Sequence, residues 1–190
     1  MKKAIHPSGD RATSAPAASG QTSGETNGGD LGKLVELIDG IRVAIMMTGR
    51  CNDSPPHARP MYTQKLDAAH FDGTLWFMTD AGSKKLDEIA RDPSVILVYA
   101  APDKNRYVVV QGVASAERDP DVAQELWNIH AKGWWPGGPD DPRLMLIRVE
   151  TESAEYWDGP SNTSYMLSLL KAVMSGERVH TESDHGTLHS

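Results

Sequence analysis

The sequence predicts a mainly β fold with flanking helices (α+β), arranged as a six-stranded antiparallel barrel with helices packed at its edges. Six segments have strand character, and most follow one another through short links, as antiparallel neighbours do. Regular strand–helix–strand alternation is absent, which argues against a doubly wound parallel sheet. A chain of 190 residues fits one domain with a proper core.

The two ends of the chain differ in composition from its middle. Residues 1–30 are mostly Ser, Thr, Ala, Gly and Pro, and such a segment buries too little apolar surface to offset its ordering entropy. Residues 176–190 are polar and contain histidines. We therefore expect flexible tails over 1–30 and 176–190 and a single domain over 31–175.

The apolar pattern between the tails gives the expected elements. Strands are expected over 41–48, 57–66, 73–79, 95–101, 107–116 and 144–149, the last running on irregularly to Trp157. Helices are expected over 31–39, 83–91, 119–129 and 164–173. Asp119-Pro120 is a typical helix start, with Asp as N-cap and Pro in the first turn. Residues 41–48 are apolar apart from Arg42 and Thr48, which predicts a strand covered on both faces.

Charge and cysteine content restrict the classes of partner. With 19 basic and 26 acidic residues the net charge is −7, which disfavours a broad nucleic-acid surface but leaves room for one small anion pocket. The single cysteine, Cys51, suits a reducing compartment. No apolar run approaches the ~18 residues that span a bilayer, and no apolar segment follows Lys2 and Lys3 as in a secretory signal. We expect a cytoplasmic protein without membrane or nucleic-acid partners.

The segment TDAGSKKLDEI, residues 79–89, is the most informative for chemistry. It places Gly82, Ser83, Lys84 and Lys85 at the start of a helix, where free backbone N–H groups and the helix dipole favour a phosphate. The serine hydroxyl and the two ammonium groups would add charge-assisted hydrogen bonds. Taken alone, Ser83 can also be an ordinary N-cap with solvated lysines beside it, which is the commoner arrangement.

Other residues suggest a phosphate and a planar ring. Arg59 lies in an expected strand and could reach the same anion as Lys85, or it could be a surface charge. Trp76 and Trp127 fit packing positions, whereas Trp134 and Trp135 fall in a Gly/Pro-rich loop, where aromatic side chains suit a flat ligand or a partner surface.

Several kinds of site are not indicated. The seven histidines are scattered, so we expect no metal site, and Cys51 has no evident histidine partner for nucleophilic catalysis. The chain has no Walker or dinucleotide-binding fingerprint. His57 is interpreted as an ordinary polar strand residue, because no carboxylate partner can be named for it from sequence.

Three segments in this order resemble the pyridoxamine-phosphate oxidase-like superfamily, specifically its general stress protein branch. They are WFMTDAGSKKLDEIARDPSV, WWPGGPDDPRLMLIRV and EYWDG, and the resemblance extends from about Leu31 to Val173. It implies a split β-barrel that forms a homodimer and binds two FMN molecules, or FAD in some relatives, at the subunit interface.

The resemblance also implies roles for particular residues. Arg59 and Lys85 would bind the flavin phosphate, assisted by Ser83 and Lys84. Pro60, Met61 and Tyr62 would run along the ribityl chain and ring, and the backbone of Trp76, Phe77, Met78 and Thr79 would touch the flavin. Trp134 and Trp157 would approach from the partner chain or close the edge of the site, and Tyr107 stands where the oxidases have a flavin-contacting glutamine.

The sequence departs from the true oxidases after Trp157, where Asp-Gly-Pro-Ser-Asn replaces an Arg-x-His element that binds the vitamin's phosphate. This argues against pyridoxamine-phosphate oxidase activity. The leading hypothesis is an FMN-dependent oxidoreductase acting on a small molecule, with no general acid or base that can be named. The alternatives are a flavin-sequestering protein, a deazaflavin-dependent reductase, and a barrel that has lost its ligand; the scattered histidines disfavour haem.

Overall fold

The computed structural model describes residues 28–49, 55–64, 66, 69–160, 162–175 and 184–189. The expected N-terminal tail therefore lies outside the described residues up to position 27, and so does Cys51. Within the described ranges, no helix has the length and apolar character needed to cross a bilayer.

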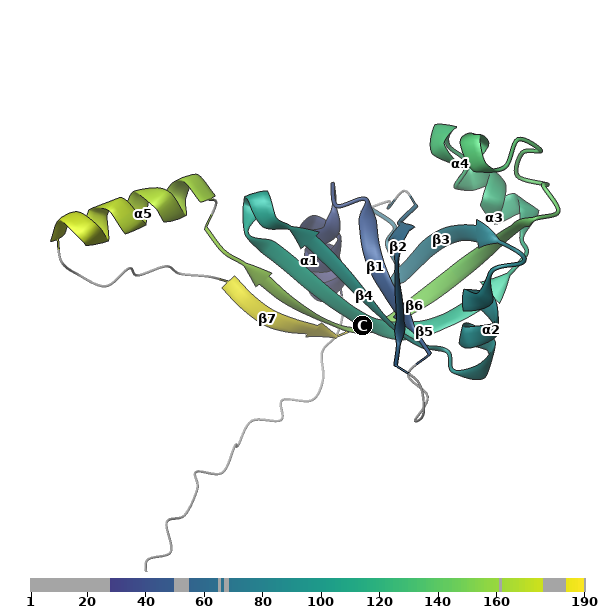
Figure 1. Ribbon diagram of the computed structural model, residues 1–190, viewed down its shortest axis with the longest axis horizontal. Coiled ribbons are helices and arrows are strands. Elements are labelled where there is room, and N and C mark those ends of the chain that lie inside the picture. The colour runs from purple at the N-terminus through teal and green to yellow at the C-terminus, as the bar shows by residue number, and fades with distance from the viewer. Residues whose placement is uncertain are drawn as a thin grey trace, which may run out of the picture.

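Six strands form one antiparallel sheet that curls into a split barrel (Figure 1). They are β1 (Val43–Thr48), β2 (His57–Tyr62), β3 (Thr74–Asp80), β4 (Ser94–Ala101), β5 (Arg106–Glu117) and β6 (Leu144–Asp158), in the order β2-β1-β4-β5-β6-β3. The outer strands β2 and β3 meet only where β2 ends, through a bridge between Thr63 and Phe77. The backbone N–H of Gln64 donates to the carbonyl of Trp76 at 2.9 Å there. Beyond this point β2 and β3 diverge and leave the barrel split.

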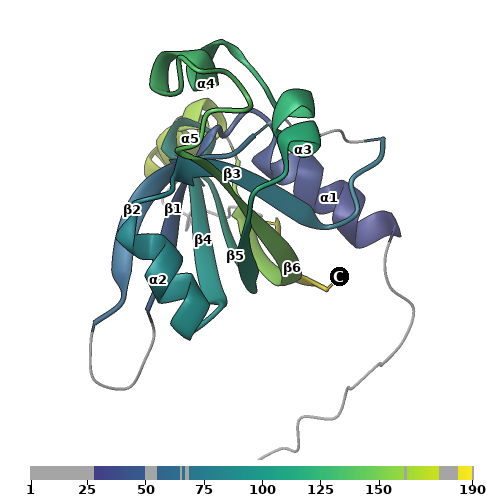
Figure 2. The same cartoon turned by 90° about the vertical axis from the view of Figure 1, so that its right-hand side faces the viewer.

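The helices other than α5 (Asn162–Ser175) lie around this barrel (Figures 1 and 2). They are α1 (Gly28–Ile38), α2 (Lys84–Arg91), the 3₁₀ turn η1 (Pro102–Lys104), α3 (Pro120–Glu125) and α4 (Ile129–Trp134). The predicted six-stranded barrel with helices at its edges is thus confirmed.

Two apolar clusters hold the elements together. The larger one fills the barrel and includes Leu97, Val108 and Phe77, each fully buried. The smaller one lies outside β3 and β6, where Met78 and Leu144 pack against α3 and α4. Since β3 has a cluster on each face, its sequence shows no polar alternation. Trp76 and Trp127 pack against the smaller cluster, which confirms their predicted role in packing.

One expected helix is two in the structure. The pattern over 119–129 predicted a single helix, but α3 ends at Glu125 and α4 begins at Ile129. Asn128 starts the second helix, because its side-chain oxygen accepts hydrogen bonds from the backbone N–H groups of His130 and Ala131. This cap fixes Ile129 as the start of α4.

The expected loose C-terminal tail is wrong for six of its residues. Asp184–His189 form a seventh strand, β7, which pairs antiparallel with the last part of β6. Leu188 is buried in the barrel cluster, and this one apolar anchor in a polar stretch explains why composition alone predicted a tail. Figure 1 shows β7 beside β6, with α5 standing away from the barrel.

The strand β1 differs from its prediction in burial. Ala44, Met46 and Thr48 point into the barrel, whereas Val43 and Ile45 are 47% and 40% exposed. The outer face of β1 is therefore uncovered in a single chain, although the continuous apolar run predicted a strand covered on both faces.

Candidate functional site

A cleft of about 560 Å³ opens where β2 and β3 diverge, bounded by α4 on one side and by the start of α2 on the other. Figures 1 and 2 show the two helices on opposite sides of β3. Lining residues include Pro60, Met61, Tyr62, Met78, Thr79, Lys85 and Trp134, all of them candidates from the sequence. The chain thus gathers segments from three separate parts of the sequence at one cavity of ordinary ligand size.

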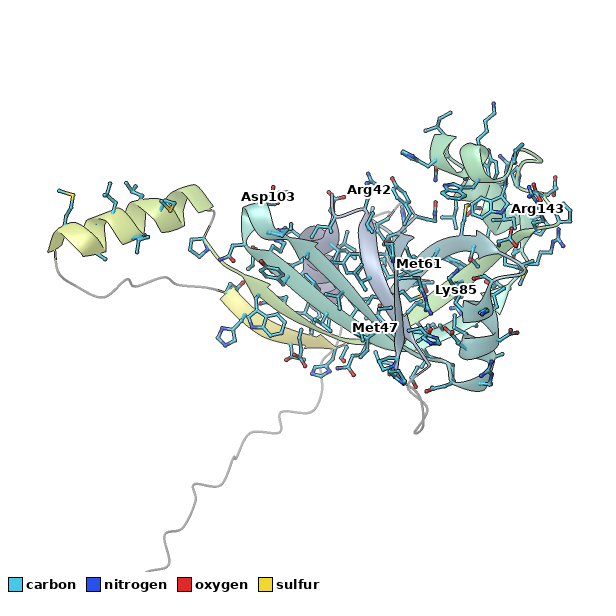
Figure 3. The ribbon with its side chains drawn as sticks, viewed as in Figure 1. Arg42, Met47, Met61, Lys85, Asp103 and Arg143 are labelled. Atoms are coloured by element: carbon cyan, nitrogen blue, oxygen red, sulfur yellow. The ribbon has the colours of Figure 1, made fainter. Side chains whose placement is uncertain are left out.

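Lys85 carries the positive charge in this cleft. Its ammonium group donates to the hydroxyls of Thr79 at 2.8 Å and Ser83 at 2.5 Å. Burial, and then the positive charge of Arg59, lower the pKa of Lys85, although the carboxylates of Glu88 and Asp80 partly oppose this. A bound anion would relieve both unfavourable effects. Figure 3 shows Lys85 beside Met61 at the mouth of the barrel.

The start of α2 leaves backbone groups open to a ligand. Ser83 is at the N-cap position, but its hydroxyl makes no capping hydrogen bond and accepts from Lys85 instead. The interpretation of Ser83 as an ordinary side-chain cap is therefore wrong. Asp80 lines the cleft nearby and holds the preceding turn, since its carboxylate accepts from the backbone N–H of Gly82 at 2.9 Å.

Arg59 lies next to this site but is not among the residues that line the cleft. Its guanidinium donates to the hydroxyl of Thr48 at 2.5 Å and to the carboxylate of Glu88 at 2.7 Å. The Thr48 hydroxyl in turn donates to Glu88, and the ring of His57 contributes a further hydrogen bond at 2.6 Å. His57 thus has a carboxylate partner after all, which could not be identified from sequence because Glu88 is 31 residues away.

Glu88 is the centre of this network. Burial alone would raise its pKa, but hydrogen bonds from Thr48, His57 and Arg59 outweigh burial and lower the pKa to about 2. Glu88 is therefore ionised at neutral pH, and it holds the Arg59 guanidinium close enough to Lys85 to act on that ammonium electrostatically.

The α4 side of the cleft contains residues that sequence reasoning missed. Gln64, Asn128, His130 and Ala131 line it. Trp135, already a candidate from the sequence, also lines the cleft, as do Val43 and Asp80. The Asn128 amide donates to the side-chain oxygen of Gln64 at 2.8 Å and so ties α4 to the end of β2. Asparagine is a favoured N-cap residue, so Asn128, three residues before the buried Ala131, could have predicted the start of this helix from the sequence.

Other predicted residues lie outside the cleft. Phe77 is fully buried in the barrel, Trp76 faces the α3–α4 side of β3, and Lys84 is exposed. Tyr107 and Trp157 are register partners at the far end of β5 and β6. Neither Tyr107 nor Trp157 is among the residues that line the cleft.

The chain matches known proteins over most of its length. The profile of the family described as "Pyridoxamine 5'-phosphate oxidase like" matches residues 30–180. General stress protein 26 of Bacillus subtilis is 24% identical over 141 residues, which cover 72% of this chain and 94% of that protein. Protein bli-3 of Neurospora crassa is 31% identical over 112 residues, or 54% of each protein, so the chain spans about half the length of this relative.

The fold also matches solved structures. The general stress FMN/FAD binding protein from Xanthomonas citri superimposes with a TM-score of 0.59 at 23% sequence identity. The match covers 70% of this chain and 90% of that one. At this identity the likeness concerns the fold.

Proposed function

This chain belongs to the pyridoxamine 5'-phosphate oxidase-like family, and we propose that it is a general stress protein-like flavoprotein that binds FMN in the cleft. The observation that carries the proposal is the Lys85 ammonium, which among the described residues bonds to two hydroxyls alone, at a helix start whose N-cap side chain does not cap. Such a donor set fits a phosphate monoester. The relative from Xanthomonas citri, described as FMN/FAD binding, supports the same cofactor.

The residues around Lys85 fit the rest of a flavin mononucleotide. Met61, Tyr62 and Met78 offer an apolar and aromatic path from Lys85 toward α4, as a ribityl chain and a tricyclic ring require. The bound flavin would supply the redox chemistry, and the protein's part is to hold the phosphate, orient the ring and limit water. We propose an oxidoreductase acting on a small molecule.

The absorption spectrum of the purified protein, taken after adding FMN and removing the excess, tests the cofactor directly. We expect a retained flavin band near ~450 nm with quenched fluorescence. Retention of FAD but not FMN would correct the choice of flavin, and retention of neither would refute a flavin site. Sustained oxidation of NADH or NADPH by the loaded protein would separate an oxidoreductase from a flavin-sequestering protein.

We further propose that the working unit is a homodimer joined through the outer face of the barrel. Cross-strand pairs place Pro60, Ile45, Val98 and Val109 in one row on that face. Water-exposed apolar rows of this kind mark an interaction surface. In a two-fold symmetric dimer, one end of this face in each subunit lies against the other end of the same face in the partner. Such an arrangement would let Trp157, which is 44% exposed, approach the partner's cleft.

A charge on this face should separate the subunits. We expect light scattering to give about twice the 20.7 kDa chain mass for the wild type and one chain mass for Ile45→Glu, because a buried unpaired carboxylate opposes association. Ile45→Glu should also lose FMN, although Ile45 does not line the cleft. Ile129→Glu is the control, since Ile129 is more exposed and lies on α4. A monomeric wild type that retains FMN would contradict an interfacial site.

A further inference from the structure

The α4 side of the cleft differs chemically from the Lys85 side. Its lining combines the rings of Tyr62, His130, Trp134 and Trp135 with the small side chain of Ala131. It has no lysine, arginine or carboxylate among the described lining residues, because Lys85 and Asp80 lie by the start of α2 and the end of β3. This side therefore suits an uncharged ligand with flat faces.

The amides on this side are already occupied. The Asn128 oxygen accepts from the backbone N–H groups of His130 and Ala131, and its amide donates to Gln64 and to the carbonyl of Leu126. The Gln64 amide donates to the carbonyl of Tyr62 at 3.3 Å. These contacts fix α4 against β2 and leave Asn128 without spare hydrogen-bonding capacity for a ligand.

His130 is the polar group left for recognition. Its ring lies 5.2 Å from the ring of Tyr62, centroid to centroid, at an interplanar angle of 37°. Among the described residues, none forms a hydrogen bond with either ring nitrogen of His130. The Tyr62 contact orients the imidazole, and an imidazole in either protonation state has an N–H to donate. Trp134, 78% exposed, extends the aromatic wall outward from the cleft.

We propose that this wall, formed by Tyr62, His130 and Trp134, is a second subsite that binds a planar ring carrying a carbonyl oxygen, as in quinones. His130 donates a hydrogen bond to the carbonyl, and Trp134 and Tyr62 contact the faces of the ring. The inference rests on the proposed function for its role, since the subsite would place such a substrate beside the flavin. Quinones would then be the class of small molecule on which the proposed oxidoreductase acts.

Binding of tetramethyl-1,4-benzoquinone, whose substituted ring does not add thiols, tests the subsite by equilibrium dialysis against the FMN-treated protein. We expect the dissociation constant to rise about fivefold in His130→Ala, through loss of one hydrogen bond, and about tenfold in Trp134→Ala, through loss of ring contact. His130→Gln, which can still donate, should recover part of the affinity. Ile129→Ala, on α4 but outside the cleft lining, should bind the quinone as the wild type does.

Flavin retention, measured by absorbance on the same samples, separates this proposal from the previous one. Unchanged FMN retention with weakened quinone binding supports both. A wild type that retains no flavin but shows the same pattern of quinone binding supports the subsite and refutes the flavin site. Quinone binding that is equal in all variants, or loss of FMN in His130→Ala and Trp134→Ala, overturns the subsite, because the wall would then have no ligand or would serve the flavin itself.

Discussion

Replacing Lys85 with methionine is expected to weaken FMN binding roughly ten- to a hundredfold, because a charge-assisted hydrogen bond contributes about 1.5–3 kcal/mol. Methionine keeps most of the aliphatic length and removes only the ammonium group. Dissociation constants from the quenching of FMN fluorescence measure the effect. Thermal unfolding of both proteins checks that the Thr79 and Ser83 hydroxyls, which lose their partner, have not destabilised the barrel.

Lys84→Met is the matched control for this substitution. It removes the same charge from the adjacent position of the same helix, but Lys84 is exposed and does not line the cleft. We expect it to change the FMN affinity less than threefold, as for a screened surface charge. Equal losses in the two variants would mean that the general charge of α2, and not a specific contact of Lys85, attracts the phosphate.

The pH dependence of FMN binding follows from the same group. Burial and the nearby Arg59 charge lower the pKa of Lys85 in the free protein, and a phosphate placed beside it would raise that pKa again. Binding then takes up a proton at any pH where the free amine is partly neutral. The FMN affinity of the wild type should fall as the pH rises through the lowered pKa, and the affinity of Lys85→Met should lack this fall.

The strands were predictable because most of the side chains that the barrel buries are apolar. Residues 73–79 were recognised as a strand from one unbroken apolar run, and the structure explains the run by an apolar cluster on each face of β3. The strand β7 was missed because Leu188 is its only buried residue, so its stability comes from pairing with β6 and not from its composition.

The site was predictable only in part. The sequence indicates which side chains can bind a ligand, but it does not show which of them are already hydrogen-bonded to other side chains of the folded protein. Lys85 and Ser83 were expected to act side by side on an anion, and the structure brings them within 2.5 Å. For Arg59 the sequence could not show that Glu88, which lies 29 positions away, accepts from its guanidinium. The position of His130 in the cleft was missed for a similar reason, since it depends on the helix break at Asn128.

Replacing Glu88 with glutamine is expected to destabilise the protein by about 3 kcal/mol at neutral pH. The Glu88 side chain is 11% exposed but its partner His57 is 62% exposed, so solvent screens part of this network and the contribution is smaller than the full pKa shift implies. The ordinary pKa of 4.5 falls to about 2 in the folded protein, and each pKa unit corresponds to about 1.4 kcal/mol. The glutamine amide also leaves the Arg59 guanidinium without a charged partner. Denaturant unfolding of both proteins measures the difference.

The sign of the pH effect distinguishes this ion pair from a simple packing defect. A carboxyl group whose pKa is lowered by folding contributes its full stability above the unfolded pKa, here 4.5, and loses it as the pH falls toward about 2. The stability difference between wild type and Glu88→Gln should therefore be constant near pH 7 and shrink below about pH 4.5. A difference that stays constant down to pH 3 would show that the glutamine disturbs packing around Thr48 and that the charge of Glu88 contributes little. If the ion pair is what matters, Glu88→Gln should also alter FMN binding, because Glu88 holds Arg59 in place and offsets part of the Arg59 charge that acts on Lys85.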